Sequence, residues 1–129
     1  MFNILVVDDD RNIRFMMKEV LELENFTVHT ATNGVDALET LAKEHIDLVI
    51  VDIMMPKMNG YEFTKELREM NAELPVLMVS AKQLSEDRKK GFMVGIDDYM
   101  SKPIDPEELS LRVKAILRRS KIAYERRDI

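Results

Sequence analysis

Asp47-Leu48-Val49-Ile50-Val51-Asp52 is the stretch of sequence that decides the fold. Four aliphatic residues follow one another without a polar break, and an aspartate bounds them on each side. A strand that is apolar at every position is buried on both faces, as the strands of a parallel sheet are. The segment therefore predicts a central strand in a sheet that helices cover on both sides.

Short apolar runs and helix-spaced apolar residues alternate along the rest of the chain. The expected strands are Ile4–Val7, Thr27–Thr30, Leu48–Val51, Val76–Val79 and Tyr99–Ser101. The expected helices are spanned by Ile13–Leu21, Val35–Leu41, Phe63–Met70, Ser85–Val94 and Asp105–Leu117. Asp10 and Asn59 stand where N-caps are expected. Five strands alternating with five helices predict an α/β fold with a doubly wound five-stranded parallel sheet.

Length and composition limit the possible functions. The chain has 129 residues, a net charge of −5 and no cysteine, which indicates one domain without disulfides, thiolate metal sites or cysteine nucleophiles. An acidic surface repels phosphates, so we expect no nucleic-acid binding by this domain itself. The apolar runs are too short to cross a membrane, and no signal peptide is recognisable. We expect a cytoplasmic protein.

Polar residues follow four of the five expected strands. Asp8 and Asp9 follow the first strand, Asp52 the third, Ser80 the fourth and Lys102 the fifth. Ligands of open parallel sheets bind beyond the carboxyl ends of the strands. If the strand order is 2-1-3-4-5, the first and third strands are neighbours, and their aspartates lie side by side.

Acids gathered in this way repel one another. Two unit charges about 4 Å apart cost on the order of 4 kcal/mol at an effective dielectric constant near 20. A divalent cation relieves that repulsion, and all-oxygen ligands suit Mg²⁺. A carboxylate nucleophile, a metal, a lysine and a hydroxyl are what phosphoryl transfer requires. Each residue alone has an ordinary structural explanation, but the four positions together predict this chemistry.

The chain also resembles the receiver domain of bacterial two-component response regulators, from Ile4 to about Arg119. The resemblance rests on the following segments: Leu5-Val6-Val7-Asp8-Asp9-Asp10, Asp47-Leu48-Val49-Ile50-Val51-Asp52-Ile53-Met54-Met55-Pro56, Asn59-Gly60, Val79-Ser80-Ala81 and Gly95-Ile96-Asp97-Asp98-Tyr99-Met100-Ser101-Lys102-Pro103. It implies the flavodoxin-like receiver fold, with strand order 2-1-3-4-5.

The resemblance implies a role for each acid. Asp52 is expected to be the phosphoacceptor, which receives a phosphoryl group from a sensor histidine kinase. Asp8, Asp9, Asp52 and the backbone carbonyl of Met54 are expected to be the Mg²⁺ ligands. On this basis the chain is a phosphorylation-controlled switch that catalyses only its own phosphorylation and dephosphorylation, and it is not a turnover enzyme.

Four further residues have roles that the resemblance implies. Ser80 is expected to hydrogen-bond the phosphoryl oxygens, and Lys102 to pair with the acyl phosphate. The peptide bond between Lys102 and Pro103 is expected to be cis. Tyr99 stands at the position of the aromatic switch residue, which turns inward when Ser80 moves toward the phosphate.

The end of the chain is similar to the winged-helix transcriptional subfamily, whose receivers dimerise through helix 4, strand 5 and helix 5. The matching charges are Arg88 with Glu108, and Asp97 or Asp98 with Arg112. We expect a receiver domain over residues 1–119, and a charged tail or the start of a linker over residues 120–129. A homodimer upon phosphorylation and a C-terminal DNA-binding domain are expected.

Three other functions are open to a sequence of this kind. One is a stand-alone phosphorelay regulator without DNA-binding output. Another is a phosphatase with an aspartyl-phosphate intermediate, but that class needs a second acid two residues after the nucleophile, where this chain has Met54. A flavin carrier needs a phosphate loop after the first strand, where Asp8, Asp9 and Asp10 repel phosphate.

Overall fold

The computed structural model describes residues 2–81, 89–90 and 94–127 and contains one five-stranded sheet. The strands are β1 (Asn3–Val7), β2 (Thr27–Ala31), β3 (Leu48–Asp52), β4 (Val76–Ser80) and β5 (Asp98–Ser101). All neighbouring strands are parallel, in the order β2-β1-β3-β4-β5. The predicted fold class and strand order are therefore confirmed.

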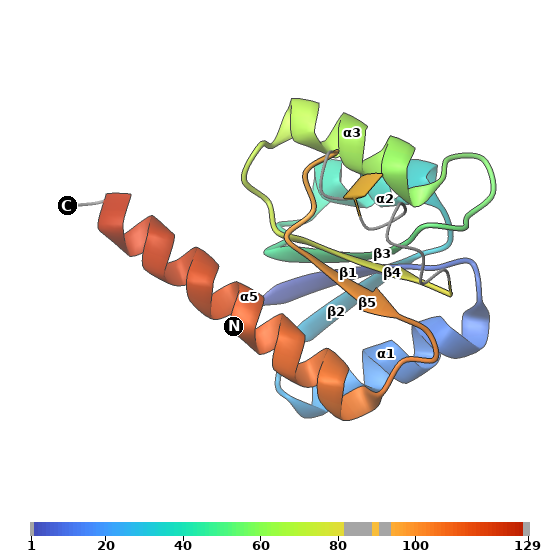
Figure 1. The fold of residues 1–129 in the computed structure, drawn as a ribbon, viewed down its shortest axis with the longest axis horizontal. Coiled ribbons are helices and arrows are strands. Elements are labelled where there is room, and N and C mark those ends of the chain that lie inside the picture. The colour runs from blue at the N-terminus through green and yellow to red at the C-terminus, as the bar shows by residue number, and fades with distance from the viewer. Residues whose placement is uncertain (1, 82–88, 91–93, 128–129) are drawn as a thin grey trace.

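Helices cover both faces of the sheet. The described helices are α1 (Arg11–Leu23), α2 (Gly34–Lys43), α3 (Gly60–Met70) and α5 (Pro106–Arg127). Figure 1 shows α1 and α5 on one face, and α2 and α3 on the other. The helix expected over Ser85–Val94 lies mostly outside the described residues. Helix α5 continues past the sheet to Arg127, so the segment expected to be a tail begins as helix.

Alternate residues of each strand enter two separate cores. In β1, Leu5 and Val7 pack with α2 and α3, while Ile4 and Val6 pack with α1 and α5. Every residue of β3 is buried, as its unbroken aliphatic sequence predicts. Burial on both faces fixes the central strands, and therefore fixes which residues stand at their carboxyl ends.

Capping residues set where the helices begin after those strands. The carboxylate of Asp10 accepts the main-chain N–H groups of Asn12 and Ile13, which confirms it as the N-cap of α1. Asn59 is the N-cap of α3 and forms a reciprocal capping box with Glu62. The loops between strand and helix are therefore held at both ends. Within the described residues, no helix combines the length and the apolar character that a membrane span requires.

Candidate functional site

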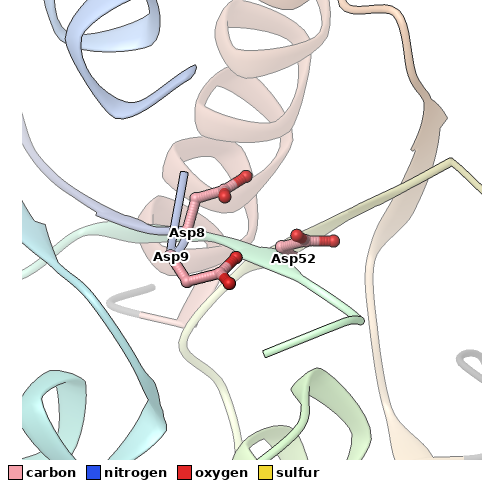
Figure 2. A group of neighbouring side chains, drawn as sticks. All are labelled: Asp8, Asp9 and Asp52. Carbon is pink, nitrogen blue, oxygen red and sulfur yellow. The ribbon is translucent and has the colours of Figure 1, made fainter. Parts of the chain in front are cut away.

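Three carboxylates lie together at the carboxyl end of the sheet. Asp8 and Asp9 follow β1, and Asp52 is the last residue of β3, which pairs directly with β1. One oxygen from each carboxylate lies within 4.8 Å of the others, and Figure 2 shows the three side chains as neighbours. Asp8 and Asp52 are buried, whereas Asp9 is exposed. The structure therefore brings together the acids that the sequence places after two separate strands.

Lys102 connects the two buried acids. Its Nζ donates to Oδ2 of Asp8 over 3.1 Å and to Oδ2 of Asp52 over 3.0 Å. The side chain of Lys102 is 17% exposed, so its contacts with the carboxylates are largely shielded from solvent. Lys102 follows β5, two strands away from β3, and no local sequence signal specifies this contact.

The balance of burial and charge raises the pKa of both members of the Asp52–Lys102 pair. Burial raises the pKa of Asp52, the charge of Asp8 raises it further, and Lys102 opposes this only in part. Burial favours the neutral amine of Lys102, but the hydrogen bonds and charges of Asp52 and Asp8 outweigh it, so its pKa is also raised. One lysine therefore does not neutralise the carboxylates, and the site favours additional positive charge.

Main-chain N–H groups hold the other carboxylate oxygens. Oδ1 of Asp8 accepts the N–H of Asp10 over 2.8 Å, and Oδ1 of Asp52 accepts the N–H of Met54 over 3.3 Å. These bonds orient both buried carboxylates within the loops that follow β1 and β3. The thioether of Met54 itself is turned outward, with 56% of the residue exposed.

The residues fit a hard divalent cation. Three carboxylates face one lysine, all their donor atoms are oxygen, and the exposed Asp9 leaves one side open to solvent. A pocket of about 550 Å³, lined by Asp9, Met54 and Asn59 among others, opens beside the acids. A hydrated ion can therefore approach the carboxylate of Asp9 from solvent.

Ser80 and Tyr99 lie on the neighbouring strands β4 and β5. Ser80 is the last residue of β4 and is fully buried, and its carbonyl accepts the N–H of Lys102 over 2.8 Å. Tyr99 is 2% exposed and packs in the core between the sheet and helices α2 and α3. The peptide bond between Lys102 and Pro103 is cis. The structure thus places the hydroxyl and the lysine on the ends of adjacent strands.

The charges expected at a dimer face form pairs within one chain. Arg112 bonds both oxygens of Asp98, at 3.0 and 2.9 Å, and also Glu108 at 2.8 Å. These contacts raise the pKa of Arg112. Asp97 instead pairs with Arg68 over 3.2 Å, a contact that the sequence did not indicate. Arg88 lies outside the described residues.

Sequence reasoning also missed two arginines. Nη1 of Arg14 donates to the carbonyl of Asp8 over 2.8 Å. Arg68 donates to the carbonyls of Leu74 and Gly95, over 2.6 Å each, and so ties the end of α3 to the segments before β4 and β5. Neither arginine belongs to a motif, and on an amphipathic helix each resembles any other surface cation. Only the three-dimensional contact distinguishes them.

Comparison with known proteins agrees with the family that the sequence resembles. The family model named response regulator receiver domain matches residues 4–114. The alkaline phosphatase synthesis transcriptional regulatory protein PhoP of Bacillus subtilis is 45% identical over 93% of this chain and 50% of its own length. The transcriptional regulatory protein CpxR of Escherichia coli is 46% identical over 93% of this chain and 51% of its own length.

A solved structure agrees with these relatives. The chemotaxis protein CheY4 of Vibrio cholerae superposes with a TM-score of 0.87 at 33% identity, covering 90% of this chain and 98% of CheY4. This chain spans about half the length of the two transcriptional relatives. The acids after β1 and β3, the lysine after β5 and the match over residues 4–114 lead to one conclusion. The chain belongs to the response regulator receiver domain family.

Proposed function

We propose that Asp52 accepts a phosphoryl group from a sensor histidine kinase in a Mg²⁺-dependent reaction. The observation that carries this proposal is the position of Asp52, buried at the end of β3 between Asp8 and Lys102. A carboxylate oxygen of Asp52 forms the new bond to phosphorus, while the bond between phosphorus and the histidine nitrogen of the kinase breaks. The released histidine keeps the electron pair of that bond and takes up a proton.

Each remaining residue of the site has one task in this reaction. Asp8, Asp9, Asp52 and the carbonyl of Met54 hold Mg²⁺, which when bound neutralises negative charge on the phosphoryl oxygens. Lys102 already lies between the two buried acids and pairs with the product phosphate after the transfer. These side chains position one phosphoryl group and turn over no further substrate, so the domain is a regulatory phosphoacceptor and not a turnover enzyme.

The hydroxyl of Ser80 donates to a phosphoryl oxygen once Asp52 is modified. Phosphorylation adds about −1.5 to −2 units of charge at a site where carboxylates are already crowded. Ser80 ends β4, and Tyr99 lies on the neighbouring β5 opposite Met78. We expect a shift of Ser80 toward the phosphate to change the packing of Tyr99. The change reaches the face formed by β5 and α5, to which the helix expected over Ser85–Val94 would also belong.

We further propose that the output is control of transcription from the cytoplasm. Both relatives that are twice as long are named transcriptional regulatory proteins. In this proposal residues 1–119 form the receiver, residues 120–129 lead toward a winged-helix domain, and DNA contacts belong to that domain. A stand-alone phosphorelay regulator is the alternative, and the complete open reading frame distinguishes the two.

The phosphorylation test compares the wild-type chain with Asp52→Asn. Incubation with acetyl phosphate and Mg²⁺ is expected to add one phosphoryl group to the wild type, seen as a mass increase, and none to the variant. Chelation of Mg²⁺ is expected to abolish the labelling of the wild type. Equal labelling of both proteins would reject Asp52 as the acceptor.

The dimer face is tested separately. Phosphorylated wild type is expected to sediment as a dimer, held in part by the charges of Asp97, Asp98, Glu108 and Arg112, together with Arg88. Arg112→Glu is expected to remain a monomer after labelling, because it replaces the positive charge that is proposed to pair with Asp97 or Asp98 across the dimer face. The control is Lys18→Glu on α1, which lines a pocket with residues of β2, at the opposite edge of the sheet from β5. Dimerisation of phosphorylated Arg112→Glu to the wild-type extent would exclude this face.

A further inference from the structure

We infer that Arg14 is a positioning residue for the metal site, acting through the peptide unit that joins Asp8 to Asp9. This inference rests on the proposed function, because it assigns Mg²⁺ to the three acids. Arg14 lies in the first turn of α1 and is half-buried. Its side chain returns across the loop, and Nη1 donates to the carbonyl of Asp8 over 2.8 Å.

The remaining polar atoms of Asp8 are bonded elsewhere. Its N–H donates to the carbonyl of Ala31 over 3.2 Å, its Oδ1 accepts the N–H of Asp10, and its Oδ2 accepts Nζ of Lys102. The side chain and the amide of Asp8 are therefore fixed without Arg14. Arg14 adds a hydrogen bond to the carbonyl oxygen of Asp8, which belongs to the peptide unit between Asp8 and Asp9.

That peptide unit carries Asp9. The carbonyl of Asp8 and the N–H of Asp9 lie in one rigid plane, so a bond to the carbonyl fixes the rotation of the whole unit. Asp9 is exposed, whereas Asp10 is anchored as the N-cap of α1. The hydrogen bond from Arg14 therefore orients the backbone from which the one exposed carboxylate of the site reaches the other two.

A role of Arg14 through its charge and a role in positioning Asp9 predict opposite changes in Mg²⁺ affinity when Arg14 is removed. A fixed positive charge near the acids repels Mg²⁺, so a role limited to charge predicts tighter binding when Arg14 is removed. A positioning role predicts weaker binding, because Asp9 loses its orientation. Residues that orient metal ligands typically contribute about tenfold or more in metal affinity. The sign of the change therefore separates the two explanations.

The experiment measures Mg²⁺ affinity by NMR titration of backbone amides with MgCl₂, without any phosphodonor. Arg14→Ala is expected to bind Mg²⁺ about tenfold more weakly than the wild type. Arg14→Lys keeps a donor and is expected to recover most of that affinity. Arg11→Ala removes a charge from the same turn of α1 and is expected not to weaken binding. Arg14→Gln, a milder change, replaces Arg14→Ala if that variant does not fold.

A double-mutant cycle tests whether Arg14 acts through Asp9. In the Asp9→Asn background, Arg14→Ala is expected to change the Mg²⁺ affinity by less than about twofold, because the ligand it orients is gone. Equal or tighter Mg²⁺ binding by Arg14→Ala, or an equal loss in both backgrounds, would overturn the inference. If the wild-type chain is labelled on Asp52 but Arg14→Ala gives either of these results, only the role of Arg14 is refuted. If the wild-type chain is not labelled on Asp52, the proposed function is refuted.

Discussion

Lys102 donates a hydrogen bond from Nζ to Oδ2 of Asp52 over 3.0 Å, and both side chains are largely buried. The same nitrogen lies 3.1 Å from Oδ2 of Asp8. The lysine is thus a counter-charge for the acids and, in the proposed reaction, also a donor beside the carboxylate that accepts the phosphoryl group. These two roles have opposite consequences when the lysine is removed.

Lys102→Met is expected to slow labelling by acetyl phosphate while strengthening Mg²⁺ binding. Loss of a preorganised donor typically costs about 100-fold in rate, which phosphorylation kinetics at saturating Mg²⁺ would show. Mg²⁺ binding tightens because a positive charge leaves the acids. Unchanged labelling at saturating Mg²⁺ would show that Lys102 has no part in the transfer.

Gly60→Ala is expected to destabilise the fold by about 1–3 kcal/mol, measured by urea unfolding. A Cβ at this position would lie 2.6 Å from the carbonyl oxygen of Asp52 and 2.9 Å from Cα of Ile53, both of which are backbone atoms. The end of β3 would have to move, and Asp52, the proposed phosphoacceptor, would move with it.

Gly34→Ala is the matched control, since Gly34 is also the first residue of a helix. The atoms nearest to its Cβ would be side-chain atoms of Met58, with the sulfur at 2.9 Å and Cβ and Cγ at 3.0 Å. A flexible methionine side chain can shift, so a smaller loss of stability is expected than for Gly60→Ala. Equal losses for the two variants would mean that proximity to the Asp52 backbone is not the cause.

Arg68→Met is expected to lower the free energy of unfolding by about 2 kcal/mol, because it removes charge-assisted hydrogen bonds to the carbonyls of Leu74 and Gly95. The methionine keeps most of the apolar stem. Lys65→Met, at an exposed position of the same helix, is expected to change stability by less than about 0.5 kcal/mol. Urea unfolding of both variants checks the difference, and similar values would contradict it.

Glu24 is expected to titrate below its ordinary range. A hydrogen bond from Lys114 and another from Ser110 lower its pKa, against a small opposing effect of burial. A carboxyl with a lowered pKa in the folded state stabilises the protein above its unfolded pKa, and this contribution is lost as the pH falls through the folded value. Stability therefore decreases on acidification.

Lys114→Met is expected to raise the pKa of Glu24 toward its ordinary value, seen by NMR titration of the side-chain carboxyl. The contribution of Glu24 to stability at neutral pH then becomes smaller, because the folded and unfolded pKa values approach each other. Lys18→Met, which leaves the pair intact, serves as the control. A Glu24 titration identical in wild type and Lys114→Met would refute the assignment of the shift to Lys114.

Local pattern was sufficient to predict the strands and the polar residues that stand at their carboxyl ends. The unbroken run Leu48–Val51 specifies burial on both faces, and the residue that ends it must then lie at the edge of the sheet. The caps Asp10 and Asn59 act within three residues, so the sequence alone identified them. Such signals depend on neighbours along the chain and are readable without tertiary structure.

Contacts between distant residues were decided only in three dimensions. Lys102 reaches Asp8 across 94 residues of sequence, and Arg68 reaches Gly95 across 27. The preference of Asp97 for Arg68, and of Arg112 for Asp98, depends on where α3 ends and where α5 begins against the sheet. The sequence by itself determined which groups stand at the ends of the strands. Packing determined which of them touch, because the partner of a long charged side chain depends on the distance and orientation of a separate element.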